Sequence, residues 1–440
     1  MGTIDIFGAP VSHGNRASVA AFGAAALRML AYDPDPGAAI DAVLERDPDF
    51  IMGRCFRAGI YLTASDKRYQ PPMARELARL QQLAPHANER ERGHIGAIAL
   101  WHRGQFHAAS QAYADILLKH PRDLCALQFG HQTDFLLGSA SSMRDRPARV
   151  LRHWSEADAG FPYILGMQAF GLEEAGHFSQ AEAMAQRCLS LNPRDTWAIH
   201  ALAHCYEMQG RTAEGIAFLE RTEAHWARDN YLAIHNRWHL ALYHVEHCRF
   251  EQALALHDRH MTVTVDSQLM DLHDSAAMLW RLALDGVTAG DRWEVLADRY
   301  AQVIDQAYIA FTDMHAMMAF VAAGRESAAR ALIEVLEAHA DGPGTSALVI
   351  RAAGLPIVRG FHAFGNGDYA AAKSWLSGAR HLSHLFGGSV AQRDVINLTL
   401  IAAAIRSHDR AMVEGLVAER TLLKPPSALT AFLLSRAASH

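Results

Sequence analysis

The 440-residue chain is predicted to be all-α, an α-solenoid of antiparallel helix pairs curved around a concave cavity. Three observations predict this fold. Apolar residues recur at steps of three and four along most of the chain, as on one face of a helix, and β-branched runs are few. A turn glycine recurs at a nearly constant spacing. A proline stands 17 residues after two of these glycines, where it would end the second helix of a pair.

The turn positions define the repeat. They are Gly104, Gly138, Gly176, Gly210, Cys248, Gly286, Gly324 and Gly367, with Cys248 standing in for one glycine. Their spacings are 34, 38, 34, 38, 38, 38 and 43 residues, and about 34 residues is the tetratricopeptide period. Pro121 and Pro193 are the two prolines that follow a turn. The sequence therefore predicts a tetratricopeptide-like solenoid.

The organisation expected is one solenoid over residues 1–440. It would consist of N-terminal helices in 1–90, tetratricopeptide-like repeats in 91–340, and C-terminal helical repeats with a cap in 348–440. Breaks at DPDPGA and ERDPDF place the first helices at 16–32 and 38–46. Two segments rich in Ser, Gly, Asp and Pro, 139–148 and 340–347, are expected to be loops.

Helix starts are indicated by capping residues. Asp195 or Thr196 is the expected N-cap of a helix over 197–209. Ser389 is the expected cap of a helix that begins near Ala391, with Asp394 in its first turn.

The composition excludes several classes of partner. Half of the residues are hydrophobic, 20% are charged and the net charge is −6, so nothing favours nucleic acid or an anionic membrane. The N-terminus lacks the pattern of a signal peptide, and no run approaches 18 uninterrupted apolar residues. The five cysteines form no C-x-x-C pair, which favours a reducing compartment. A cytoplasmic protein is expected, and a homo-oligomer is left open.

Histidine is the unusual residue, with 26 in the chain. In HALAHCYEMQG, steps of four and three residues place His200, His204 and Glu207 on one stripe of a helix. The spacing is that of the His-x3-His of zinc peptidases, but Ala201 stands where their glutamate would be. A second pair, His235 and His239, follows in IHNRWH.

By resemblance to tetratricopeptide arrays, residues 13, 10, 6 and 3 before each turn line the concave surface. Counting back from Gly210 gives Trp197, His200, His204 and Glu207. The other repeats contribute Phe170 and Glu173, His235 and Trp238, and further aromatic and methionine residues, with no Lys, Arg or Asn. Such a lining is typical of a small-molecule pocket.

Six stretches resemble, in the same order, the tetratricopeptide repeat protein 38 family: GMQAFGLEEAGHFSQAE, WAIHALAHCYEMQGRTAEG, IHNRWHLALYHVE, DSAAMLWRL, FTDMHAMMA and GGSVAQRDV. The resemblance extends over nearly the whole chain. It implies the solenoid fold but gives almost no indication of the activity. Val390 departs from the family, which usually has His there in GGSHAQRD, so any help that position gives to a site would be altered.

The hypothesis for function is that the cavity binds a small, largely apolar molecule and that the protein is an enzyme. Histidines with a reference pKa of about 6.5 would move protons in a hydrolysis, elimination or isomerisation. The candidate catalytic residues are His200, His204, Glu207, His235 and His239. The candidate ligand-binding residues are Trp197, Trp238, Glu173, Phe170, Asp313, His315, Gln392, Arg393 and Asp394.

Two alternatives stay open. A metal-dependent hydrolase would hold Zn²⁺ or another divalent metal with His200, His204, His235 and His239, although no metal or other cofactor is assigned from the sequence. An interaction scaffold would instead grip a peptide or a partner helix along its concave face.

Overall fold

The computed structural model describes residues 3–438, which are almost entirely helical. Two short strands, β1 (Thr3–Ile4) and β2 (Pro10–Val11), pair antiparallel near the N-terminus. By their contacts the residues form two compact units: unit 1 is Met1–Leu202 with Ala224–Leu232, and unit 2 is Ala203–Glu223 with Ala233–His440. The single solenoid expected over 1–440 stays a prediction.

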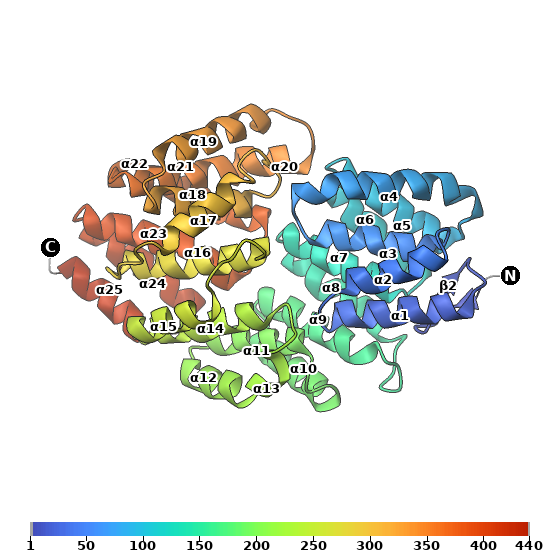
Figure 1. Cartoon of the computed structure of the whole chain (residues 1–440). Coiled ribbons are helices and arrows are strands. Elements are labelled where there is room, and N and C mark those ends of the chain that lie inside the picture. The colour runs from blue at the N-terminus through green and yellow to red at the C-terminus, as the bar shows by residue number, and fades with distance from the viewer. Residues whose placement is uncertain (1–2, 439–440) are drawn as a thin grey trace. The chain divides into compact units, whose positions relative to one another are not determined.

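Unit 1 is built from consecutive antiparallel helices (Figure 1). They are α1 (Arg16–Leu30), α2 (Pro36–Arg46), α3 (Ile51–Thr63), α4 (Gln70–Leu83), α5 (Glu89–His102), α6 (Phe106–Lys119), α7 (Leu124–Leu136), α8 (Ala140–Leu151), α9 (Phe161–Glu174) and α10 (Phe178–Leu191), with short 3-10 turns at Lys67–Tyr69 and Ala84–His86. The helix α11 (Thr196–Met208) begins in unit 1 and ends in unit 2, and the short α13 (Glu223–Trp226) lies mostly in unit 1.

Unit 2 continues the same pattern of helix pairs. Its helices are α12 (Thr212–Arg221), α14 (Ala233–Glu246), α15 (Phe250–His260), α16 (Leu269–Leu284), α17 (Arg292–Ala301), α18 (Ala310–Ala322), α19 (Glu326–Ala340), α20 (Gly344–Val349), α21 (Leu355–Gly365), α22 (Tyr369–Ala379), α23 (Val390–Arg406), α24 (Arg410–Leu423) and α25 (Ala428–Ala438). A π-helical turn, Ile350–Gly354, joins α20 to α21, and a 3-10 segment, Arg380–Phe386, precedes α23. The all-α fold of antiparallel helix pairs is confirmed.

The predicted turn positions are also confirmed. Each of the eight has a positive φ, from 55° at Cys248 to 92° at Gly286. Another turn of this kind joins α23 to α24, where His408 has φ 56°. The glycine pattern missed it because histidine occupies the left-handed position.

The predicted helix caps are confirmed as well. A carboxylate oxygen of Asp195 accepts a hydrogen bond of 2.9 Å from the amide of Ala198, in the first turn of α11. Ser389 caps α23 reciprocally with Gln392: the Gln392 amide donates to the Ser389 hydroxyl at 3.2 Å, and the Ser389 amide donates to Gln392 Oε1 at 2.9 Å. This capping box satisfies two amides that would otherwise lack partners.

The loop expected at 139–148 is wrong, because most of it belongs to α8. Pro147 lies inside this helix, where it cannot bond the carbonyl of Met143 one turn earlier. Tertiary packing outweighs that loss: Met143, Pro147 and Val150 are buried, and Arg146 forms a buried ion pair of 2.7 Å with Asp134 on α7. The loop expected at 340–347 is shorter than predicted, since α19 ends at Ala340 and α20 begins at Gly344.

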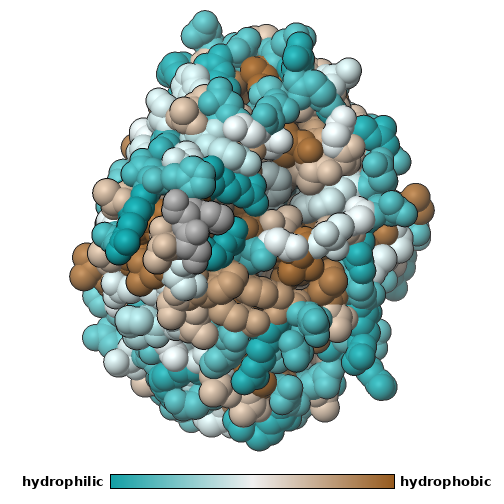
Figure 2. Space-filling model, turned by 90° about the vertical axis from the view of Figure 1, so that its left-hand side faces the viewer, coloured by the Kyte–Doolittle hydropathy of each residue, from teal (hydrophilic) through white to brown (hydrophobic). Residues whose placement is uncertain are grey.

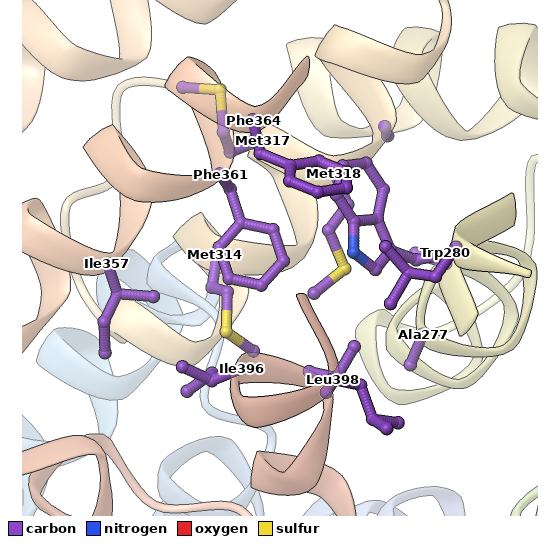
Figure 3. Close-up of a cluster of buried hydrophobic side chains, with 14 of the residues drawn as sticks. Ala277, Trp280, Met314, Met317, Met318, Ile357, Phe361, Phe364, Ile396 and Leu398 are labelled. Atoms are coloured by element: carbon purple, nitrogen blue, oxygen red, sulfur yellow. The ribbon is translucent and has the colours of Figure 1, made fainter. Parts of the chain in front are cut away.

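The inner faces of the unit 2 repeats meet in a continuous apolar core (Figure 3). Trp280, Met314, Met318, Ile357 and Phe361, which the repeat count places on the inner face, are all buried in it. Helix α23 closes over them with Ile396 and Leu398. A hydrogen bond of 2.9 Å from Trp280 Nε1 to Thr399 Oγ1 fixes α16 against α23.

One segment of unit 2, Gly344–Gly365, is long and apolar enough to cross a membrane by length and composition alone. Of its most apolar window, 61% is buried inside the protein, as is usual for a core helix. On the face of the molecule that carries the C-terminal helices, apolar side chains gather in small groups among hydrophilic ones (Figure 2).

Candidate functional site

Helices α11 and α14 place three histidines of unit 2 in contact. His204, His235 and His239 can each turn a ring nitrogen into a space in which these atoms lie within 4.8 Å of one another. The ring centroids of His204 and His239 are 4.4 Å apart, and those of His235 and His239 are 4.9 Å apart. All three side chains are buried. We refer to them as the three-histidine cluster.

The fourth predicted histidine, His200, lies in unit 1. It stands one turn before His204 on the continuous helix α11, so the helix itself fixes their separation at about 6 Å along the axis. Its ring stacks on Phe170 of α9 with centroids 5.2 Å apart, and Trp197 lies 4.9 Å away. Trp197 also stacks on Tyr32 at 5.4 Å. Phe170, Trp197 and His200 therefore share one aromatic cluster within unit 1, and Glu173 is buried on the same helix as Phe170.

Asp274 orients one member of the three-histidine cluster. The Nδ1 atom of His235 lies 2.9 and 3.0 Å from the two carboxylate oxygens of Asp274, on α16. The ring also stacks on Trp238, with centroids 5.3 Å apart. Because a carboxylate accepts, we assign the proton of the neutral ring to Nδ1. The repeat count missed Asp274 because it gives His273, one residue away, in a 38-residue repeat.

Burial also sets the charge of His239, one member of the three-histidine cluster. It lowers the pKa of the His239 imidazole well below its ordinary value, and the neighbouring His204, His235 and Arg281 lower that pKa further. Removing a charge from water is costly unless it is paired. His239 is therefore neutral at physiological pH.

Glu207 connects the three-histidine cluster to a cavity. Its Oε2 lies 3.7 Å from His239 Nδ1, and its Oε1 accepts a hydrogen bond of 3.1 Å from Lys424 Nζ. Glu207 also lines a cavity of about 480 Å³ formed by the end of α11, the 3-10 segment, α23 and α24. We call this space the α23–α24 cavity. Of the five candidate catalytic residues, only Glu207 lies on its wall.

The wall of the α23–α24 cavity combines apolar and charged side chains. Its charged residues are Glu207, Arg380, Arg393, Asp394, Glu419, Arg420 and Lys424, and its apolar residues include Met208, Val390, Ile396, Leu416, Leu422 and Leu423. The lining was expected to lack Lys and Arg, which is wrong for this cavity. The repeat count covered the inner helices only up to Gly367, whereas these cations come from the C-terminal helices.

The charged groups are mutually paired. Glu246 accepts from Arg420 at 2.6 Å and lies 2.6 Å from Lys424 Nζ, while Asp394 lies 3.0 Å from Arg420. Burial and the nearby Arg420 lower the pKa of Lys424, but the carboxylates of Glu246, Glu207 and Asp394 outweigh them, and the pKa is raised. Lys424 is therefore a charged donor at neutral pH.

The sequence-predicted residues of GGSVAQRD divide between two roles. Arg393 and Asp394 line the α23–α24 cavity, and Arg393 donates to the main-chain carbonyl of Gly388. Gln392 is the partner of Ser389 in the helix cap, which accounts for its burial. Val390, where the resembling family has His, is on the cavity wall.

A second cavity, of about 690 Å³, lies at the turn ends of α16, α18 and α21. Four predicted inner-face residues line it, namely Trp280, Ala283, Val321 and Phe364. Arg406 also lines it, with its guanidinium 4.6 Å from the centre of the Phe364 ring. We call it the aromatic cavity.

Asp313 and His315, on α18, line neither of these two cavities. The ring of His315 is 4.9 Å from that of His273, and its Nδ1 donates to the carbonyl of Phe311 at 2.7 Å. Burial raises the pKa of Asp313 to about 7 and lowers that of His315 to about 4. Both are buried within unit 2, apart from these cavities.

Comparison with known families identifies a repeat segment in the middle of the chain. Residues 172–233 match the tetratricopeptide repeat family. The matched segment runs from the end of α9 through α13 and contains α11, with His200, His204 and Glu207. The tetratricopeptide repeat predicted from the turn spacing is thus confirmed in this part of the chain.

Proposed function

We propose that unit 2 binds a small, largely apolar molecule with an acidic group in the α23–α24 cavity, and that the protein is an enzyme acting on it. The observation that carries the proposal is the position of Glu207. Its carboxylate lies on the cavity wall, contacts Lys424 and stands 3.7 Å from His239. A buried carboxylate at a mainly apolar cavity is a typical proton-transfer group.

The ligand class follows from the wall. Leucine, isoleucine, valine and methionine side chains would cover an apolar body. Arg393 would face an acidic group, because a guanidinium has five N–H donors and can bind a carboxylate while keeping a main-chain partner.

The reaction class is proton transfer leading to hydrolysis, elimination or isomerisation. Glu207 would exchange the proton with the bound molecule, since it reaches the cavity. The three-histidine cluster does not line the cavity. Its side chains would therefore act through Glu207.

A small molecule is favoured over a peptide because of burial. A peptide would have to contact the inner-face side chains of unit 2. Those of Trp238, Met314 and Phe361 are fully buried. Ile396 and Leu398 of helix α23 are buried in the same core as these side chains. The scaffold function has no such support from the inner face of this unit.

Membership of the tetratricopeptide repeat protein 38 family is part of the proposal. The six resembling stretches support it, and two of them contain the site residues of α11 and α14. A cytoplasmic location is also proposed, in keeping with five cysteines that form no disulfide among residues 3–438. A homo-oligomer stays a prediction.

Binding is tested by calorimetry on the full chain with octanoate, which joins an apolar tail to a carboxylate, and with 1-octanol as its uncharged counterpart. Octanoate is expected to bind more tightly. Val390→Trp, which fills the α23–α24 cavity, should abolish binding, and Arg393→Ala should weaken it. Val321→Trp and Arg406→Ala, in the aromatic cavity, are the matched controls. Unchanged binding in a folded Val390→Trp variant would refute the assignment.

Catalysis is tested with p-nitrophenyl octanoate as a hydrolysis probe. Glu207→Gln keeps the shape of the side chain and removes its basicity, so the rate is expected to fall about 100- to 10,000-fold. A folded Glu207→Gln variant with the rate of the wild-type protein would rule out the catalytic role.

A further inference from the structure

We propose that the three-histidine cluster is a zinc site, with His204, His235 and His239 as ligands. The inference rests on the arrangement of these side chains within unit 2 and does not require that the α23–α24 cavity bind a molecule. It adds a metal to the three-histidine cluster, next to Glu207.

The first argument is geometric. Ring nitrogens of the three histidines lie within 4.8 Å of one another. In a tetrahedral zinc site, Zn–N bonds of about 2.0–2.1 Å place the nitrogens about 3.4 Å apart. Rotations of the imidazole rings by roughly 1 Å at the nitrogens would close this difference, without a change in the helices.

The second argument is the carboxylate behind His235. Histidines that bind metals almost always donate their other ring N–H to a carboxylate or carbonyl, which fixes the tautomer and the orientation of the ring. Asp274 holds His235 Nδ1 at 2.9 Å in this way. The stacking of His235 on Trp238, with the rings inclined by only 10°, restricts its rotation further.

The third argument is charge. A divalent cation between buried imidazoles needs negative charge nearby. Asp274 contacts one ligand and Glu207 lies 3.7 Å from another. Two cations oppose this charge. Arg281 donates to the main-chain carbonyls of Ala277 and Ala391, with its guanidinium 5.2 Å from the Trp238 ring, and Lys424 pairs with Glu207 at 3.1 Å. Asp274, in direct contact with His235, is therefore the carboxylate that favours a cation at the site.

The donor atoms select the metal. Three imidazole nitrogens suit zinc, whereas magnesium and calcium require oxygen ligands. Three protein ligands leave a fourth position, as in catalytic zinc sites. Glu207, which lies 3.7 Å from His239, is the residue of unit 2 placed to reach it.

A second histidine pair in unit 2 offers an internal comparison. His273 and His315 have their ring centroids 4.9 Å apart, much as His235 and His239 do. Nδ1 of His315 is bonded to the carbonyl of Phe311, and no third histidine, cysteine or carboxylate completes a metal-binding group there among residues 3–438. This pair should not bind zinc.

The experiment is elemental analysis of the full chain purified without a histidine tag, followed by removal of metal with a chelator and titration with Zn²⁺ and Co²⁺. One zinc per chain is expected, and Co²⁺ should give the visible absorption of a tetrahedral nitrogen site. His235→Asn and His239→Asn should each abolish stoichiometric binding, whereas His315→Asn should retain it. Asp274→Asn should weaken zinc binding about 10- to 100-fold.

Circular dichroism and a cooperative thermal transition establish that each variant is folded. If a variant of one of the three histidines does not fold, the zinc titrations of Asp274→Asn and of the wild-type protein test the proposal instead. The inference fails if the folded wild-type protein takes up neither metal in a one-to-one ratio, or if Asp274→Asn and His239→Asn bind zinc as the wild type does. Octanoate binding by a protein without metal would then still support the proposed function, so the two failures are distinguishable.

Discussion

The carboxylate of Glu207 and the ammonium of Lys424, 217 residues apart in sequence, form a buried ion pair of 3.1 Å. Lys424 is also 2.6 Å from Glu246 and 3.7 Å from Asp394. One cation from the end of α24 thus meets carboxylates of α11, α14 and α23. The pair ties the candidate catalytic residue to the last helices of unit 2.

Lys424→Met is expected to destabilise the protein by about 3–5 kcal/mol. Removing one partner of a buried ion pair leaves a buried charge without compensation, which is the costly case. Arg420 still pairs with Glu246 and Asp394, so the lower part of this range is expected. Chemical denaturation at pH 7 measures the change.

Lys373→Met is the matched control. Lys373 forms an ion pair of 2.8 Å with Asp409, and both side chains are partly exposed. Partly exposed pairs contribute about 0–1 kcal/mol. Equal losses in the two variants would show that the Lys424 cluster is no more important than a surface pair.

Much of the repeat architecture could be predicted because the left-handed turn favours glycine. Seven of the eight predicted turns use glycine, and Cys248 was found from the spacing of its neighbours. His408 was missed because histidine is not a typical turn residue, although its spacing of 41 residues from Gly367 lies within the range of the other turns. Helix α8 was missed for another reason: Ser and Pro signal a loop locally, while the burial of Arg146 against Asp134 depends on another helix.

The candidate site was predictable where one helix carries it. His204 with Glu207, and His235 with His239, follow from helical spacing alone. Asp274, Arg420 and Lys424 were missed because their importance depends on contacts between distant helices. No periodicity in the sequence shows that Lys424 meets Glu207.

Asp313→Asn is expected to stabilise the protein at pH 8 and to have little effect at pH 4. Burial raises the pKa of Asp313 to about 7 in the folded protein. A raised carboxyl pKa contributes stability below the unfolded pKa of about 3.9, and this is lost as the pH rises to the folded pKa. The asparagine stays neutral throughout, so the difference between variant and wild type should grow from pH 4 to pH 7 and reach about 4 kcal/mol at most.

His315 makes the comparison with the wild type necessary. Burial lowers its pKa to about 4, so its contribution to stability is lost as the pH falls from about 6.5 towards 4, opposite in sign to that of Asp313. Because both proteins contain His315, its contribution cancels from the difference between their free energies of unfolding. Urea denaturation at several pH values measures it, and a difference independent of pH would show that Asp313 is not buried as a neutral acid.

Gly171→Ala is expected to destabilise unit 1 by about 1–3 kcal/mol through overpacking. A Cβ atom at Gly171 of α9 would lie 2.3 Å from the carbonyl oxygen of Met143 on α8. This is the carbonyl that Pro147 leaves without its helical partner, and the absence of a side chain lets α9 approach it. Gly96→Ala on α5, where a Cβ meets nothing within 4 Å, should instead be neutral or stabilising by up to about 1 kcal/mol. Denaturant midpoints compare the two, and equal effects would contradict the close approach.

Cys248→Gly is expected to stabilise the protein by about 1 kcal/mol. Cys248 has φ 55° at the turn between α14 and α15, a conformation that costs a residue with a Cβ about 1–2 kcal/mol and costs glycine little. The entropy of glycine in the unfolded chain offsets part of this gain. The reciprocal variant is Gly286→Ala, at φ 92° with open space around its Cβ position, and it should lose stability by a similar amount. Thermal unfolding of both variants checks the sign: if Cys248→Gly were destabilising while Gly286→Ala were neutral, the turn conformation would not be the reason for the glycine pattern.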